Sequence, residues 1–160
     1  MARTETLPLG IHALRRLNPA LSCLLTSCFH GLASQRLLVL AYRGRKSGKQ
    51  YQIPLVYVAH ADQIYCVTRD TLWWKSAVSA PSITLWLRGQ PLHMRAERAD
   101  ADDADTQAAF SKFLRHNPGT ARLLYHVPVD SRGEPDRHAL AEQLQLSNVI
   151  RFKPADGARS

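Results

Sequence analysis

The first part of the chain has apolar residues at intervals of three and four, the spacing of one face of an α-helix. This spacing starts at Ile11, and Pro19 is typical of the first turn of a second helical segment. We therefore predict an amphipathic helical region over residues 11–33. Arg15 and Arg16 give it a basic side, so two interpretations stand: packing on the protein core, which we prefer, and contact with an anionic membrane surface.

From residue 37 the pattern changes to β-branched and apolar runs separated by turn residues, which is typical of strands. The expected strands are residues 37–42, 53–59, 64–68, 82–87, 92–99 and 148–153. Three stretches instead have helical spacing. The expected helices are residues 72–79, 102–116 and 138–146, with a short helical or loop segment through Tyr125.

Six or so strands with helices at the ends and one helix in the middle indicate a mainly β protein with helices, of the α+β class. We expect a small closed or split β-barrel with helical additions. The 160 residues show no internal repeat and no linker, so we expect one domain over 1–160. With 45% hydrophobic residues, this length is enough to bury a substantial core.

The net charge of the chain limits the classes of ligand and partner that it favours. Twenty-one Lys and Arg against 13 Asp and Glu give a formal net charge of +8. Phosphates, acidic coenzymes, nucleic acids and anionic membrane surfaces all suit such a protein. Three cysteines form no closed disulfide set, and no apolar run is long enough to span a membrane, so we expect a cytoplasmic protein, at most peripheral to the inner face of the membrane.

A basic turn between the first two expected strands is the main candidate site. It runs from Arg43 to Lys49 and mixes four cations with Gly44, Ser47 and Gly48. Glycines let backbone N–H groups approach an anion, and the cations hold phosphate or carboxylate. The spacing is not that of a Walker P-loop. A solvated turn and, with nearby tyrosines, a nucleic-acid contact remain the alternatives.

No other cluster in the sequence indicates comparable chemistry. The seven histidines have neither HExxH spacing nor a Cys/His pattern, so we expect no dedicated metal site. No Gly-x-Ser-x-Gly element is present, and hydrolytic nucleophiles have no support.

Residues 38–58, which contain the basic turn and the apolar strand that Pro54 opens, resemble the signature of the deazaflavin-dependent nitroreductase family. That family belongs to the flavin and deazaflavin oxidoreductases, which share a split, FMN-binding-like β-barrel with pyridoxamine phosphate oxidase. Residues 73–81, with two tryptophans and a closing proline, resemble the short helix of that family. The resemblance covers residues 37–100 well, and the remainder only in the order of elements.

The resemblance implies a site for coenzyme F-420, or alternatively for FMN or FAD. In it, the turn holds the phosphate and the barrel wall supports the ring. The residues carried over as phosphate contacts are Arg45, Lys46, Ser47 and Gly48. Those carried over along the ring are Ile53, Pro54 and Leu55, with Trp74 and Lys75 at the border of the ring or the coenzyme tail.

The resemblance also implies a tyrosine from the C-terminal region that closes the pocket and donates a proton, and Tyr125 is the candidate, with packing at a barrel end as the alternative. The chain departs from the family pattern at three positions. Tyr51 stands where family members carry Arg or His, and Ser76 and Ala80 stand where they carry Asn. These departures leave the identity of the coenzyme open.

We therefore expect an oxidoreductase that uses coenzyme F-420 or a flavin to reduce a small hydrophobic acceptor, such as a quinone or a nitro compound. The chemistry would be hydride delivery from the coenzyme. Two other functions stay open: a non-catalytic barrel that stores a flavin, haem or lipid-like ligand, and a basic nucleic-acid-binding protein. A homodimer is also open, because barrels of this type often complete their sites between two chains.

Overall fold

The computed structural model describes residues 37–69, 71–123 and 125–155. The helical region expected over residues 11–33 lies outside these ranges. Its packing on the core and its contact with a membrane therefore stay predictions. None of the helices within the described ranges is long and apolar enough to cross a membrane.

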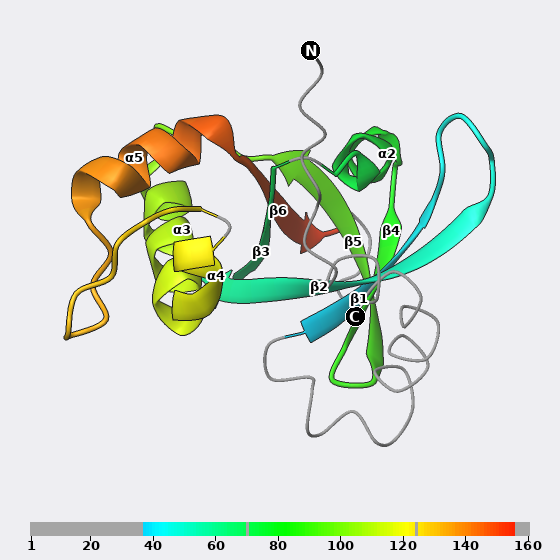
Figure 1. Cartoon of the computed structure of the whole chain (residues 1–160). Coiled ribbons are helices and arrows are strands. Elements are labelled where there is room, and N and C mark those ends of the chain that lie inside the picture. Colours follow the sequence, from blue (N-terminus) through cyan, green and yellow to red (C-terminus); the bar gives the residue numbers. More distant parts are fainter. Residues whose placement is uncertain (1–36, 70, 124, 156–160) are drawn as a thin grey trace, which may run out of the picture.

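Six antiparallel strands close into a barrel in the order β1-β2-β3-β6-β5-β4, so the predicted β-barrel is confirmed (Figure 1). Their bounds are Leu37–Arg43 (β1), Gln50–His60 (β2), Gln63–Thr68 (β3), Ile83–Leu87 (β4), Gln90–Arg98 (β5) and Asn148–Pro154 (β6). The pairing of β1 with β4, in which Leu40 lies opposite Leu85, completes the ring. Closure leaves no strand with an unpaired edge in the barrel.

The first core fills the barrel interior. Alternate residues of each strand point inward, as the two-residue period of a strand requires. Leu38, Leu40, Leu85 and Phe152 are fully buried there. Helix α2, Trp73–Ser79, packs on this core through buried Trp73 and Ala77, and it lies between the barrel and the β1–β2 hairpin (Figure 1).

A second core lies on the outer face of β2, β3 and β6, under the helices α3 (Ala104–His116), α4 (Pro118–Leu123) and α5 (Arg137–Leu146). In α3, Phe110 and Phe113 are buried against this sheet face. Burying a side chain of this size is worth about 1.5–3 kcal/mol. Helix α3 begins at Asp103, whose carboxylate accepts a hydrogen bond from the backbone N–H of Thr106, 3.1 Å away.

The elements agree with the sequence-based expectations except at some boundaries. β2 starts at Gln50 rather than at residue 53, because polar residues 50–52 pair with β1 where the hairpin extends beyond the barrel (Figure 1). The second hairpin has a two-residue turn, Arg88 and Gly89, both at positive φ, so that Pro91 lies within β5 opposite Trp86. The segment through Tyr125, for which the sequence allows a short helix or a loop, begins with helix α4 at Pro118.

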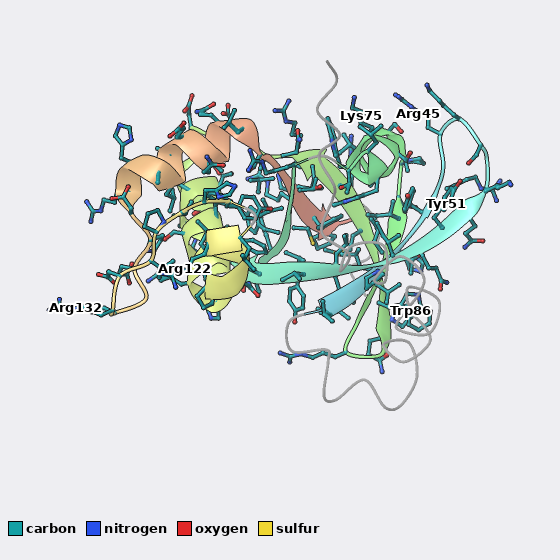
Figure 2. The ribbon with its side chains drawn as sticks, viewed as in Figure 1. Arg45, Tyr51, Lys75, Trp86, Arg122 and Arg132 are labelled. Carbon is teal, nitrogen blue, oxygen red and sulfur yellow. The ribbon has the colours of Figure 1, made fainter. Side chains whose placement is uncertain are left out.

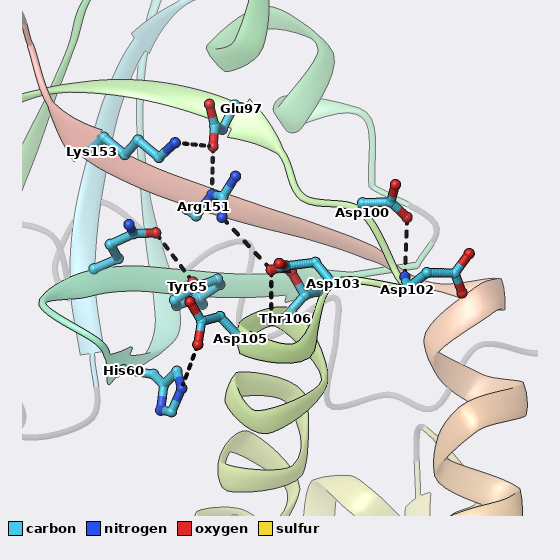
Figure 3. A network of polar contacts seen from close by, with 11 residues as sticks. His60, Tyr65, Glu97, Asp100, Asp102, Asp103, Asp105, Thr106, Arg151 and Lys153 are labelled. Atoms are coloured by element: carbon cyan, nitrogen blue, oxygen red, sulfur yellow. Dashed lines mark hydrogen bonds and ion pairs between the residues drawn. The ribbon is translucent and has the colours of Figure 1, made fainter.

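An ion-pair network ties α3 to the barrel (Figure 3). Glu97 of β5 accepts from both Arg151 and Lys153 of β6, and Arg151 lies 3.8 Å from the N-cap carboxylate of Asp103. Burial raises the pKa of Glu97, but hydrogen bonds and charges from these two cations outweigh it and hold the pKa below its ordinary value. Glu97 and Asp103 are thereby paired with cations of β6.

Candidate functional site

The β1–β2 turn is a tight, hydrogen-bonded loop. Arg43 pairs with Gln50, and the Gly44 N–H donates to the Lys49 carbonyl at 2.8 Å, so the loop spans residues 44–49. The Gly48 N–H donates back to the Gly44 carbonyl at 2.8 Å, with Gly48 at φ +65°. A left-handed residue at this position favours glycine.

The turn presents donors that have no partner within residues 37–69, 71–123 and 125–155. Of its backbone N–H groups, those of Lys46 and Ser47 donate to no acceptor among the described residues. The exposed side chains of Arg45 and Lys46 form no ion pair within the same ranges. Successive free N–H groups beside unpaired cations form a set suited to a phosphate or carboxylate. The predicted phosphate contacts therefore lie together, but they differ in their backbone donors. Among the described residues the N–H groups of Lys46 and Ser47 have no acceptor, whereas those of Arg45 and Gly48 already donate to Ser76 and Gly44.

A hydrogen bond joins this turn to α2, although the two are far apart in the sequence. The backbone N–H of Arg45 donates to the Ser76 hydroxyl at 3.3 Å. Lys75, the preceding residue of the helix, is exposed. Figure 2 shows Arg45 and Lys75 at the same end of the molecule, whereas Arg122 and Arg132 lie at the opposite end. The structure thus brings the two predicted parts of the coenzyme site together.

Trp74 gives α2, the helix to which the turn is hydrogen-bonded, an aromatic ring. Its ring is half-buried against the barrel core, with the Lys75 ammonium 5.5 Å and the Arg98 guanidinium 5.8 Å from the ring centroid. Both distances are within the range of cation–π attraction. Sequence reasoning missed Arg98, because β5 reaches α2 only through the fold. The site therefore has a third element, the end of β5.

The residues predicted along the ring divide between two faces. Ile53 and Leu55 are half-buried against the inner core together with Trp74. Pro54, between them in β2, lies on the opposite face by strand alternation and pairs with Val39. Ile53 and Leu55 can therefore act together, and Pro54 is not on their face.

Tyr51 packs against the turn, a contact that the sequence analysis did not anticipate. Its ring stacks on Tyr42, with centroids 5.4 Å apart. Its hydroxyl lies 3.1 Å from the Ser47 hydroxyl. A Cβ built at Gly44 would come within 2.7 Å of the Tyr51 ring, so this ring covers the glycine. Burial and the neighbouring Tyr51 raise the pKa of Tyr42 above its ordinary value.

Tyr125 belongs to the second core. It is 4% exposed, and its ring packs edge-on against Phe110 and Phe113, with centroids 5.7 and 6.0 Å away. The contacts of the turn and α2 come from the other core. The structure therefore does not bring Tyr125 to the turn. Its role as a proton donor stays a prediction.

A cavity of about 340 Å³ lies elsewhere, between the end of β5, α5 and the start of β6. Arg98 is the residue that it shares with the surroundings of Trp74. Its other lining residues are Ala99, Asp100, Ala101, Leu144, Gln145, Ser147 and Val149. No residue of the turn is among them, so this cavity is separate from the predicted phosphate contacts.

Two further chemistries find little support in the described part of the chain. No group of three or more His, Cys, Asp or Glu residues there is arranged to hold a metal ion. Complete burial raises the pKa of the Cys66 thiol, which disfavours the reactive thiolate.

Comparisons with known proteins give structural neighbours only. No protein-family model and no curated protein matches the chain. An F-420-H2 dependent reductase, FDR-A, has 12% identity and a TM-score of 0.50 over 74% of this chain and 95% of that one. A structure described as a domain-swapped dimer has 14% identity and a TM-score of 0.52 over 91% and 96%.

The haem storage protein HutZ from Vibrio cholerae is a third neighbour, with 12% identity and a TM-score of 0.50 over 88% of this chain and 92% of that one. At these identities the likeness concerns the fold and not the activity. The chain therefore shares the barrel fold of these neighbours, one of which is an F-420-H2 dependent reductase, and the resemblance in its sequence is confirmed at the level of the fold.

Proposed function

We propose that this protein binds a phosphate-bearing flavin-type coenzyme, coenzyme F-420 in the first place, and uses it to reduce a small hydrophobic acceptor such as a quinone or a nitro compound. One observation carries the proposal. Among the described residues, the N–H groups of Lys46 and Ser47 have no acceptor and the cations of the turn have no ion pair, and the turn is hydrogen-bonded to the helix that holds Trp74.

Each part of the site would have its own task. The backbone N–H groups and the side chains of Arg45 and Lys46 would bind the phosphate, which is the strongest charged group of such a coenzyme. Ile53, Leu55 and Trp74 would provide an apolar and aromatic wall for a ring system. Lys75 would contact either the ring border or a further anionic group. The bound coenzyme would supply the hydride, so the protein has mainly to bind and orient it.

Charge distribution supports an anionic ligand at this end of the molecule. Between residues 37 and 96 the sequence has eight Lys and Arg but only two acids, Asp62 and Asp70. Asp62 lies in the β2–β3 turn and not in the β1–β2 hairpin. The cations of the hairpin and α2 therefore have no protein carboxylate among the described residues to neutralise them.

The direct test is titration of the purified protein with coenzyme F-420, FMN, FAD and haem at one moderate salt concentration. We expect the tightest binding with F-420, followed by turnover of a quinone when the coenzyme is supplied reduced. Binding of haem alone would contradict the proposal and favour a storage barrel, as would flavin binding without turnover of any acceptor. Salt-sensitive binding of RNA or DNA, with no effect of flavins, would favour the nucleic-acid function.

A charge reversal locates the site. Lys46→Glu would put an anion beside the phosphate, so we expect at least a several-fold loss of coenzyme affinity. The matched control is Arg132→Glu, which makes the same change in net charge at the opposite end of the molecule (Figure 2). Equal affinities of the two variants would remove the turn from the site.

The homodimer and the cellular location belong to the proposal as well. A neighbouring structure is a domain-swapped dimer, which makes a dimer of this chain plausible. Sedimentation of the protein with and without coenzyme would test it. Cytoplasmic location and contact of residues 11–33 with a membrane stay predictions from the sequence.

A further inference from the structure

The side chain of Tyr51 is held in place although it is 40% exposed. On one side its ring stacks on Tyr42, with an interplanar angle of 22°. On another side the ring covers Gly44, which has no side chain to keep the ring away from the backbone. The hydroxyl is thereby directed at Ser47, the residue at the centre of the anion-binding turn, with 3.1 Å between the two oxygens.

The hydrogen bonds at Ser47 can be counted. A serine hydroxyl has one proton to donate and two lone pairs that accept. The Lys49 N–H donates to Ser47 Oγ at 3.3 Å, which occupies one lone pair. In the pair with Tyr51 either oxygen can be the donor, but a phenol is the more acidic of the two and therefore the better donor. When Tyr51 donates, both lone pairs of Ser47 are occupied.

A serine whose lone pairs are both occupied has its own proton left for a third partner. Donation by Tyr51 also polarises the Ser47 hydroxyl and strengthens the bond that it donates onward. An anion in the turn selects this arrangement, because it accepts from Ser47 and cannot donate to it. Building on the proposed function, we propose that Tyr51 is a positioning residue that holds the Ser47 hydroxyl as a donor to the bound phosphate.

This role differs from that of a cation. Tyr51 adds no charge, so its contribution depends on a hydrogen bond through Ser47 and is insensitive to ionic strength. The contribution of exposed Lys46 is a charge–charge attraction, which salt screens. Tyr51 also differs from a residue that merely packs, because the loss of its hydroxyl alone should abolish the effect.

The test compares ligands with and without a phosphate. FMN and riboflavin differ by one phosphate, whereas the chromophore of coenzyme F-420 lacks the whole phosphate-bearing tail. Wild type, Tyr51→Phe, Ser47→Ala and the double variant are titrated with FMN and riboflavin, and with coenzyme F-420 and its phosphate-free chromophore. The matched control is Tyr42→Phe, which removes a hydroxyl from the stacked neighbouring ring without touching Ser47. Melting temperatures verify that each variant is folded, and each titration is repeated at high salt.

We expect Tyr51→Phe to weaken binding of the phosphate-bearing ligand by about threefold or more at both salt concentrations, which is within the range for one hydrogen bond between neutral groups. The phosphate-free ligand should bind unchanged, the double variant should match Ser47→Ala, and Tyr42→Phe should match wild type. Wild-type affinity in Tyr51→Phe, or equal losses for both ligands, would overturn the positioning role. If wild type itself does not discriminate by the phosphate, the proposed function fails first.

Discussion

The backbone N–H of Arg45 donates a hydrogen bond to the hydroxyl of Ser76, 3.3 Å away, across 31 positions of the sequence. This contact joins a hairpin turn that presents free donors to a helix that presents an aromatic ring. Such contacts hold the basic turn against α2, whereas a hairpin turn pointing into solvent would bind anions only weakly. Substitutions at the turn and in α2 can test whether this contact contributes to coenzyme binding.

Removing the acceptor tests the link. Ser76→Ala leaves the Arg45 N–H to water and frees the turn from α2, so we expect a two- to tenfold loss of coenzyme affinity, the equivalent of about 0.5–1.5 kcal/mol. Ser79→Ala is the control, since the Ser79 hydroxyl donates to a carbonyl of the same helix. Isothermal titration of both variants measures the effect, and identical affinities would show that the link does not matter.

The two glycines of the turn should respond differently to alanine. A Cβ at Gly44 would lie 2.5 Å from Ser47 Oγ and 2.7 Å from the Tyr51 ring, so Gly44→Ala should displace both and weaken phosphate-dependent binding. At Gly48 a Cβ has open space, but the positive φ costs about 1 kcal/mol. Gly48→Ala should therefore lower the melting temperature and affect affinity less. The reverse order of affinities would contradict the geometry of the turn.

Tyr125 provides a test of the proton-donor prediction. Its burial between Phe110 and Phe113 predicts that Tyr125→Ala destabilises the fold by about 3–5 kcal/mol, the cost of truncating a buried aromatic residue. In Tyr125→Phe the ring and its packing stay. Wild-type turnover in that folded variant is what the packing predicts, and lost turnover with intact coenzyme binding would establish the catalytic role.

Stability at acid pH should depend on Glu97. Because its pKa is held below the ordinary value, about 4.3 for Glu, the ion pairs contribute stability above that value and lose it as the pH falls through the lowered pKa. Glu97→Gln should be less stable than wild type near pH 7 and show a smaller loss between pH 5 and pH 3. The exposed Glu142→Gln is the control. Parallel denaturation curves for all three proteins would contradict the expectation.

The sequence predicted those elements of the fold whose signals come from residues close together in the chain. The two-residue period of β1 and β3 and the glycines of the first turn are local signals, and the structure has these elements where they were expected. The contacts that build the site depend on long-range pairing. Nothing near Arg45 indicates that Ser76 will meet it, and nothing near Trp74 indicates Arg98.

Contacts of individual residues depend on the fold in the same way. The resemblance carries over Ile53, Pro54 and Leu55 together, but alternation along β2 puts Pro54 on the face opposite to the other two. Tyr51 was treated as a lost cation, because its hydrogen bond to Ser47 and its cover over Gly44 become visible only when the hairpin is closed. The resemblance to a family located the turn, but the role of a departing residue requires its contacts.

The most direct test of the coenzyme site is to follow backbone amide resonances by NMR during titration with coenzyme F-420. The account predicts that the largest shifts occur at residues 45–49, with further shifts at residues 74–76 of α2, and that they saturate together. Shifts concentrated at residues 98–101 and 144–149, around the separate cavity, would contradict it and move the binding site away from the turn.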